Sequence, residues 1–370
     1  EAQDASCGPD RTGCEAVTQI RERLGGAGLD PAAELDGVDV SARPEGWAPE
    51  PKPTELKLAS VQGADLQGED LRYATARDAL FVRADLREAR MRHGDYRGAW
   101  LQGAKLQRAD LSFSTFQEAH FARAPLNGAR FDGAELSRAA FFEAERADAS
   151  AVDARFEGAG FHGAKARGLR LEGADLRYAS FQDSDFSVAQ FKGGMFDKSS
   201  MVGGQFRGAL FEGVSMGDVR AADVSFMEAS FSDVSAVDAV FDRADFFQAR
   251  ITGLMLSLAG FNGAHFKEAL ITESTLRDSS FRDADFRFAT LSKVALRASD
   301  LQGADFYGAK LDDVNLAGAA LEGARFEQAD LRGAKGLTQR QLTGACGDFA
   351  TRLPDKLTVV SCVEKSAAAG

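Results

Sequence analysis

A repeat fold, and not a single globular core, is the fold class that the sequence predicts. The segment "LQGADFYGAKLDDVNLAGAALEGARF" (residues 301–326) places a large apolar side chain at every fifth position. The same register runs without insertion or deletion from Val61 to Leu331. A helix repeats its apolar face every 3.6 residues and a strand every 2, so neither element alone explains this period.

Each five-residue unit has one large apolar centre. The register holds (331 − 61)/5 + 1 = 55 units, and 23 of the 28 Phe of the chain are centres. The residue two before the centre is usually Ala, Asp often precedes the centre, and Gly often follows two residues after it. Small and large residues in fixed alternation are expected to fill successive layers of a narrow interior.

This A-D-[LF]-x-G pattern, as in Ala304, Asp305, Phe306 and Gly308, resembles the pentapeptide-repeat family over about three quarters of the chain. The resemblance implies an all-β fold, a right-handed, four-sided parallel β-helix in which each unit forms one side of a coil. The 55 units would then make nearly fourteen coils, ~65 Å long at ~4.8 Å per coil. The open ends of such a stack need caps, because unpaired strand edges invite association.

Both ends of the chain carry cap candidates. Thr12 and Glu15 form a capping-box pattern before a helical segment that stops at Gly25, and Thr338 and Gln341 begin a second, shorter one. We expect an N-terminal helical cap over 1–30, a partial coil and Pro-rich connector over 31–55, the β-helix over 56–335, and a C-terminal helical cap and tail over 336–370.

The four cysteines are Cys7, Cys14, Cys346 and Cys362, all outside the repeats. Neither pair has zinc-site spacing, and no His accompanies them, so two local disulfides are favoured over free thiols. Disulfides indicate a periplasmic or extracellular protein, with the cytoplasm as the alternative. The first residue is Glu1, which fits a removed signal peptide and equally a shortened chain. No apolar run approaches the ~18 residues of a membrane span.

Every twentieth centre is expected to lie on the same side of the coil. One such column holds four Leu and then eight Phe: Phe186, Phe206, Phe226, Phe246, Phe266, Phe286, Phe306 and Phe326. Stacked rings gain burial and ring contact, so core packing is the expected role. Between the two runs lie Arg146 and Ala166, with Ala151 close by. A buried unpaired Arg is costly, so we expect a local bulge there, with a binding site as the alternative.

Outward positions are where a partner would bind, since the interior is filled. Apolar residues gather there at Met195, Leu210, Met255, Leu258 and Leu270, which map to two adjacent sides. A contiguous apolar stripe would be a partner surface, whereas scattered apolar residues on a solvated wall are the alternative.

No catalytic residue, metal site or cofactor is expected. The four His (His93, His120, His162 and His265) fall at outward positions in different coils, and no Walker, G-x-S-x-G or H-E-x-x-H motif occurs. The sequence therefore predicts a non-enzymatic structural or interaction protein, a rigid rod whose walls face an unknown protein partner. A monomer or a weak end-to-end or C-terminal dimer is expected.

The alternative comes from the family resemblance: some pentapeptide-repeat proteins imitate DNA, bind gyrase and confer quinolone resistance. Such imitation needs a strongly acidic face. Residues 61–335 hold 41 acidic and 34 basic residues, so the charge is nearly balanced. The absence of a basic block also argues against nucleic-acid binding.

Overall fold

The computed structural model describes residues 60–145 and 148–363. Several sequence predictions lie outside these residues: the helical cap over 1–30, the connector over 31–55, Cys7, Cys14 and Arg146. For these positions the expectations above stay predictions.

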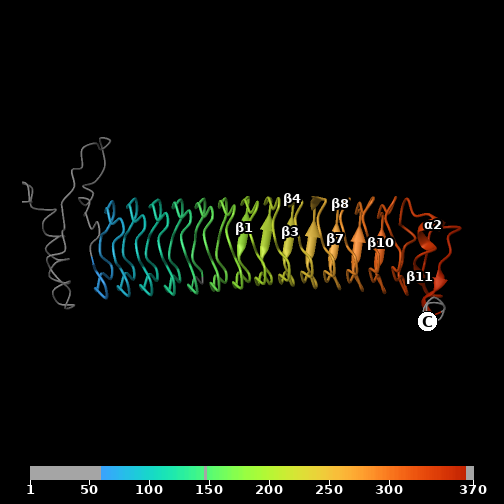
Figure 1. Ribbon diagram of the computed structural model, residues 1–370, viewed down its shortest axis with the longest axis horizontal. Helices are drawn as coiled ribbons and strands as arrows, with labels where there is room; N and C mark the ends of the chain where they lie inside the picture. Colours follow the sequence, from blue (N-terminus) through green and yellow to red (C-terminus); the bar gives the residue numbers. More distant parts are fainter. Residues whose placement is uncertain (1–59, 146–147, 364–370) are drawn as a thin grey trace, which may run out of the picture. The chain divides into compact units, whose positions relative to one another are not determined.

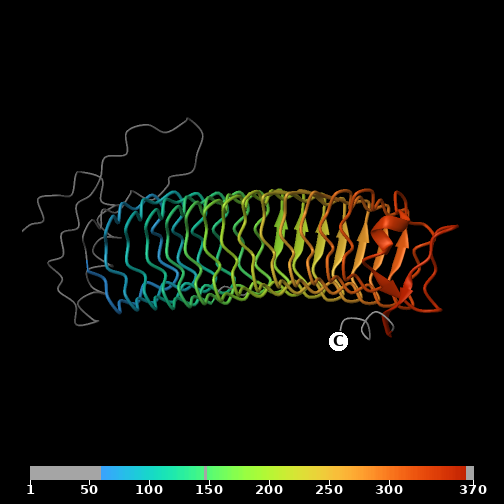
Figure 2. The same ribbon diagram turned by 45° about the vertical axis from the view of Figure 1, so that its right-hand side comes forward.

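Parallel coils stack on one another in each of two compact units, Glu1–Ser180 and Phe181–Gly370 (Figures 1 and 2). In unit 1, bridges join the residue directly before a centre to the residue twenty positions later, as in Ser60↔Leu80 and Leu80↔Trp100. Unit 2 follows the same rule, as in Asp285↔Asp305. This confirms an all-β solenoid of parallel coils. The right hand, the four-sided section and the total of nearly fourteen coils stay predictions.

Longer strands occur in unit 2. A seven-stranded parallel sheet has the order β1-β2-β3-β5-β7-β9-β10, and a three-stranded sheet has the order β4-β6-β8. The first sheet comprises β1 (Gln190–Lys192), β2 (Leu210–Glu212), β3 (Ser230–Ser232), β5 (Arg250–Thr252), β7 (Leu270–Thr272), β9 (Thr290–Ser292) and β10 (Lys310–Asp312). The second comprises β4 (Ser235–Val237), β6 (Met255–Ser257) and β8 (Thr275–Arg277).

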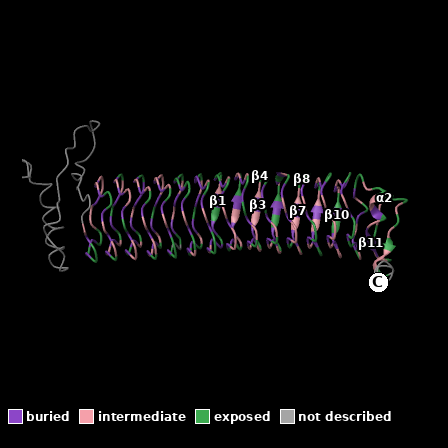
Figure 3. Ribbon diagram, viewed as in Figure 1, coloured by how far each residue is buried: buried purple, intermediate pink, exposed green. Residues whose placement is uncertain are grey.

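The core consists of the repeat centres and the small residues two positions before them. Every described centre from Val61 to Leu331 is buried, and so are the alanines at the small position, for example Ala304 and Ala309. Figure 3 shows the same alternation, with buried segments recurring along each coil. The period of five therefore reports which side chain points inward.

The corners use a left-handed backbone two residues after the centre. Gly303 has φ 71° there, but Asp, Glu and Arg residues adopt the same conformation, as at Asp78 (φ 55°), Glu88 (φ 61°) and Arg108 (φ 60°). L-residues pay a steric cost in this region, so glycine eases the corner without being required for it. Asp before the centre supports the turn: Asp305 accepts a hydrogen bond from the backbone N–H of Tyr307 at 2.9 Å.

Neighbouring Phe of the long column stack ring on ring within unit 2, except that the rings of Phe206 and Phe226 are tilted by 31°. The Phe246 and Phe266 centroids are 4.7 Å apart, with 4° between the ring planes, and Phe266 and Phe286 are 4.9 Å apart. The spacing matches that of neighbouring strands, so the rings follow the coils. In unit 1, Ala151 and Ala166 are fully buried centres.

The C-terminal segment begins with the four-residue helix α2 (Gln339–Leu342), which carries the capping box of Thr338 and Gln341. The Gln341 amide also donates hydrogen bonds to the carbonyls of Leu316 and Ala319, at 2.8 and 2.9 Å. Two short parallel strands follow, β11 (Cys346–Gly347) and β12 (Val360–Ser361). A disulfide joins Cys346 to Cys362. The segment thus satisfies backbone carbonyls of the coil before it.

Candidate interaction surface

An uncharged wall in unit 1 is the most distinctive outward feature of the described residues. Five centres spaced twenty residues apart define it, and it consists of the residues directly before and after each of them: Leu80, Val82, Trp100, Gln102, His120, Ala122, Ala140, Phe142, Gly160 and His162. We call this set the Trp100 face. Bridges from Leu80 to Trp100, His120, Ala140 and Gly160 join its first column coil by coil. None of the ten residues is Asp, Glu, Lys or Arg.

The corresponding positions on another wall of unit 1 are mostly charged. Asp70, Arg90, Asp110 and Arg130 form one bridged column there, with side chains of alternating sign. Arg90 reaches Asp70 at 3.3 Å, and Arg72 donates two hydrogen bonds of 2.8 Å to the same carboxylate. Exposed charges that neutralise one another make a solvated wall, so the Trp100 face differs from it in kind.

Two aromatic side chains project from the Trp100 face. Trp100 is 39% exposed and Phe142 47%. The Trp100 ring stacks on His120 with centroids 4.2 Å apart, and His162 meets Phe142 edge-on at 6.5 Å. Stacking along the column covers one face of the Trp100 ring with the His120 ring.

Charged residues border the Trp100 face and pair within the chain. Lys105 lies 3.2 Å from Asp85, and Lys165 lies 3.5 Å from Glu145. Arg123 pairs with Glu143 at 2.7 Å, which lowers the pKa of the Glu143 carboxyl, chiefly through the hydrogen bond from the guanidinium. An apolar centre with a charged, exposed rim is the anatomy of a protein interface.

The surface predicted in unit 2 is only partly contiguous. Met255 and Leu258 are 59% and 60% exposed, and Val237 and Val240 are exposed in the neighbouring coil. Met195 lies in the Met255 column, but Ser215 and Ser235 separate the two. Ser230 and Arg250 likewise separate Leu210 from Leu270. The structure therefore brings together two of the five predicted residues.

The Trp100 face was missed by the sequence reasoning, although the signal was present. Sorting the centres by every twentieth residue revealed the Phe column, whereas the outward positions were searched only for apolar residues before the centre. The same twenty-residue spacing applied to the residues on both sides of each centre gives a column pair that lacks Asp, Glu, Lys and Arg from Leu80 to His162, whereas Arg220 and Asp300 occur in it farther along the chain.

The four histidines do not converge. His93 stacks between Tyr73 and Phe113, with centroids 5.2 and 5.4 Å away, and His120 stacks on Trp100. His265 lies 4.0 Å from Asp285 in unit 2. These contacts give the rings packing roles on the walls.

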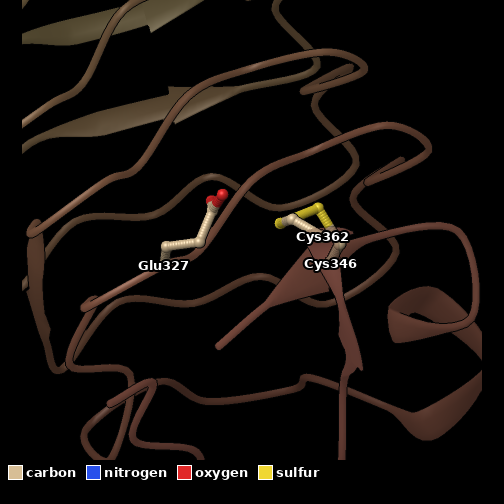
Figure 4. Close-up of side chains that lie close together, drawn as sticks. All are labelled: Glu327, Cys346 and Cys362. Carbon is tan, nitrogen blue, oxygen red and sulfur yellow. A yellow bond between two sulfur atoms is a disulfide. The ribbon is translucent and has the colours of Figure 1, made fainter. Parts of the chain in front are cut away.

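One group of potential metal ligands occurs among the described residues: Glu327, Cys346 and Cys362, whose ligand atoms lie within 4.8 Å of one another. Figure 4 shows the Glu327 carboxylate beside the disulfide. The two sulfur atoms are bonded to each other, and Arg325 donates a 2.9 Å hydrogen bond to Glu327. Because thiolate is the form of cysteine that binds metal, the intact disulfide offers no such ligand.

No helix within residues 60–145 and 148–363 is both long and apolar enough to cross a membrane.

The fold and its walls define a β-solenoid repeat protein. A family model described as pentapeptide repeats matches eight copies, over residues 54–92, 104–141, 154–193, 259–297 and 299–335. These segments cover more than half of the 370 residues. The chain belongs to the pentapeptide-repeat family. No curated protein matches the sequence significantly.

Solved pentapeptide-repeat structures resemble the chain. HetL, involved in heterocyst differentiation regulation in the cyanobacterium Nostoc, is 20% identical with a TM-score of 0.21, over 66% of this chain and 88% of its own. Full-length QnrB1, a plasmid-mediated fluoroquinolone resistance protein, is 17% identical with a TM-score of 0.25, over 62% and 94%. A protein of the Arabidopsis thaliana thylakoid lumen is 26% identical with a TM-score of 0.10, over 35% and 67%.

Proposed function

We propose that the protein is a non-enzymatic structural and interaction protein that presents its outer walls to a protein partner. The observation that carries this proposal is the Trp100 face, an uncharged wall with two exposed aromatic residues and a rim of paired charges. The described repeat centres are all buried, so the interior is occupied by side chains and binding falls to the outside.

A protein partner fits this face better than a carbohydrate. Sugar rings bind on the open faces of aromatic side chains, whereas a Trp100 ring face is covered by His120 at 4.2 Å. Exposed Trp and Phe side chains instead suit insertion between apolar side chains of another protein. Trp is among the residues most enriched at the energetic centres of protein interfaces.

The cell envelope or the extracellular space is the proposed location. The Cys346–Cys362 disulfide supports it, because disulfides persist in oxidising compartments. Mass spectrometry of the natively isolated protein tests this: the intact mass without reductant should be lower than the reduced mass by one hydrogen per bonded cysteine. Free thiols at Cys346 and Cys362 in the native protein would remove the support.

Imitation of DNA for gyrase binding is the less favoured function. A DNA mimic needs a continuous acidic face, whereas the described walls interleave both signs, as in the Asp70–Arg90 and Asp223–Arg243 pairs. A supercoiling assay with purified gyrase separates the two functions. Inhibition at low protein concentration would favour the mimic and contradict the proposal.

The decisive experiment compares cross-linked partners of three chains expressed in the native organism: wild type, Trp100→Ser/Phe142→Ser, and Phe288→Ser. Phe288 is a matched control, because it is 49% exposed but lies in unit 2. We expect one protein to be cross-linked to wild type and to the control and to be lost from the double variant. Equal capture by all three chains would show that the Trp100 face is not the partner surface.

A further inference from the structure

We propose that the Trp100 face binds the same face of a second copy of the chain, with the two walls running in opposite directions. This inference rests on the proposed function, because it takes the face to be an interaction surface and names its partner. Two observations carry it: the order of large and small residues along the face, and the order of charges along its borders.

The pairing follows from a two-fold axis that lies between the two walls, runs parallel to their strands and passes over the coil of His120. Such an axis reverses the order of the coils and keeps each column opposite itself. Trp100 then faces Ala140 of the second copy, and Leu80 faces Gly160. In the adjacent column, Phe142 faces Gln102, and Ala122 faces itself. Trp100 is thus opposite a small residue, which lets its ring enter the facing wall. Leu80 is opposite the Phe142 ring that covers Gly160, since a Cβ atom on Gly160 would lie 2.9 Å from Phe142 Cε1, so an apolar contact forms there.

The border column beside the face has complementary charges under the same axis. It reads Asp85, Lys105, Pro125, Glu145 and Lys165 along the coils. Reversal places Asp85 opposite Lys165 and Lys105 opposite Glu145, with uncharged Pro125 on the axis. The pairs already present within each chain, Lys105–Asp85 and Lys165–Glu145, would meet as a four-membered network of alternating sign.

The border on the other side of the face behaves in the same way. Its column reads Arg77, Arg97, Gln117, Ser137 and Glu157. Reversal places Arg77 opposite Glu157 and leaves uncharged Gln117 on the axis. At the two corners of the wall, Arg123 and Glu118 would each face its own copy. Each of them has a partner within its chain: Arg123 pairs with Glu143 at 2.7 Å, and Glu118 pairs with Arg138 at 3.4 Å.

A same-direction pairing is less favourable. An axis along the stack would place each coil opposite its own copy and exchange the two border columns. Asp85 would then face Arg77 and Lys165 would face Glu157, but Lys105 would face Arg97, and a like-charge contact of this kind opposes an arrangement. The antiparallel pairing makes three attractive pairs and no repulsive pair in these two columns, so it is the favoured arrangement.

The expected dimer is reversible. The face extends over five coils, about 20 Å at ~4.8 Å per coil. Its border charges are exposed, so association should weaken as salt is added.

Sedimentation equilibrium of the full chain tests the proposal with a charge inversion that keeps each in-chain pair. Glu145→Lys/Lys165→Glu preserves that pair but opposes like charges across the axis, so we expect dimer affinity to fall at least tenfold. The complementary variant, Asp85→Lys/Lys105→Glu, also carries Arg87→Ser, because Arg87 donates 2.7 and 2.6 Å hydrogen bonds to Asp85. Alone, it should also dimerise weakly.

Mixing the two variants should restore dimers, because each new charge then meets an opposite one. Asp223→Arg/Arg243→Asp, an inversion of a 2.6 Å pair in unit 2, is the matched control and should associate like wild type. A monomeric wild type at all concentrations, or dimers that resist the Glu145→Lys/Lys165→Glu inversion, would overturn the proposal.

The two proposals fail separately. If the wild type is monomeric but Trp100→Ser/Phe142→Ser loses a cross-linked partner, the face binds a different protein and the proposed function stands. If the dimer behaves as expected and no other partner is lost, the face serves self-association alone.

Discussion

The phenol ring of Tyr96 occupies the space that a Cβ atom on Gly94 would need. Such an atom would lie 2.9 Å from Tyr96 Cζ and closer still to Cε2. Gly94 stands at the position usually held by Ala, two residues before the centre, so the smallest residue accompanies the largest centre of the described coils. The Tyr96 hydroxyl donates a 2.8 Å hydrogen bond to the Leu71 carbonyl, and burial raises the pKa of this phenol.

Gly94→Ala should therefore destabilise the protein by about 1–3 kcal/mol, the usual cost of overpacking a core. Adding Tyr96→Leu should recover much of this loss, because Leu is a common centre and leaves room for Ala. Urea unfolding of the two single variants and the double variant measures the coupling. Additive effects would show that the two side chains do not compete for space.

The core of unit 2 holds a small cavity of about 20 Å³, lined among others by Ala236, Met216 and Leu256. Ala236→Val should fill part of it and stabilise the protein by about 0.5–1 kcal/mol. Ala221→Val is the matched control, since Ala221 is a buried centre that does not line the cavity. We expect the control to lose stability. A loss of thermal stability in Ala236→Val as large as in the control would contradict the prediction.

Acid should weaken the ion pairs of the walls only at a pH below the usual pKa range of carboxyl groups. The hydrogen bond from Arg332 lowers the pKa of Asp330 to about 2. A carboxyl group whose pKa is lower in the folded state stabilises the fold fully above its unfolded pKa, about 3.9, and loses this contribution as the pH falls toward 2. NMR titration of Asp330 should give a midpoint near 2 in wild type and a higher one in Arg332→Ala. Equal midpoints would refute the assignment.

The C-terminal disulfide should matter for stability, because it closes a loop with a sequence separation of 16 residues. The chain-entropy estimate for a loop of this size is about 3 kcal/mol. A Cys7→Ser/Cys14→Ser background isolates this bridge: guanidinium unfolding with and without a dithiol reductant should differ by about that amount. Identical midpoints would show that α2 and its Gln341 contacts hold the cap without the bridge.

The sequence predicted which side chains point inward, since a single register from Val61 assigns the burial of every described centre. It did so because the constraint is local: one large residue per unit, repeated without a break. It also identified the capping box of Thr338 and Gln341 from spacing alone. The corner conformation was harder to predict. Frequent Gly marked the position of the corner, but it did not indicate that Glu88 and Arg108 adopt the same left-handed backbone.

The candidate site was less predictable, because the residues that adjoin one another on a wall come from different coils and are far apart in the sequence. Met195 and Met255 share a column, but two serines intervene. Trp100 and Phe142 are 42 positions apart in sequence and lie in neighbouring columns of one wall. The twenty-residue bridges confirm which distant residues are neighbours.

The bridges between residues twenty positions apart also determine which changes of length this gene can tolerate. Loss or duplication of twenty codons within the repeats would add or remove one coil and leave every column aligned. Loss of five codons between Leu80 and His162 would instead shift every later residue to the neighbouring wall, so that the Trp100 face would be divided between two walls. Variation in length among descendants of this gene should therefore proceed in steps of twenty residues wherever a wall is under selection.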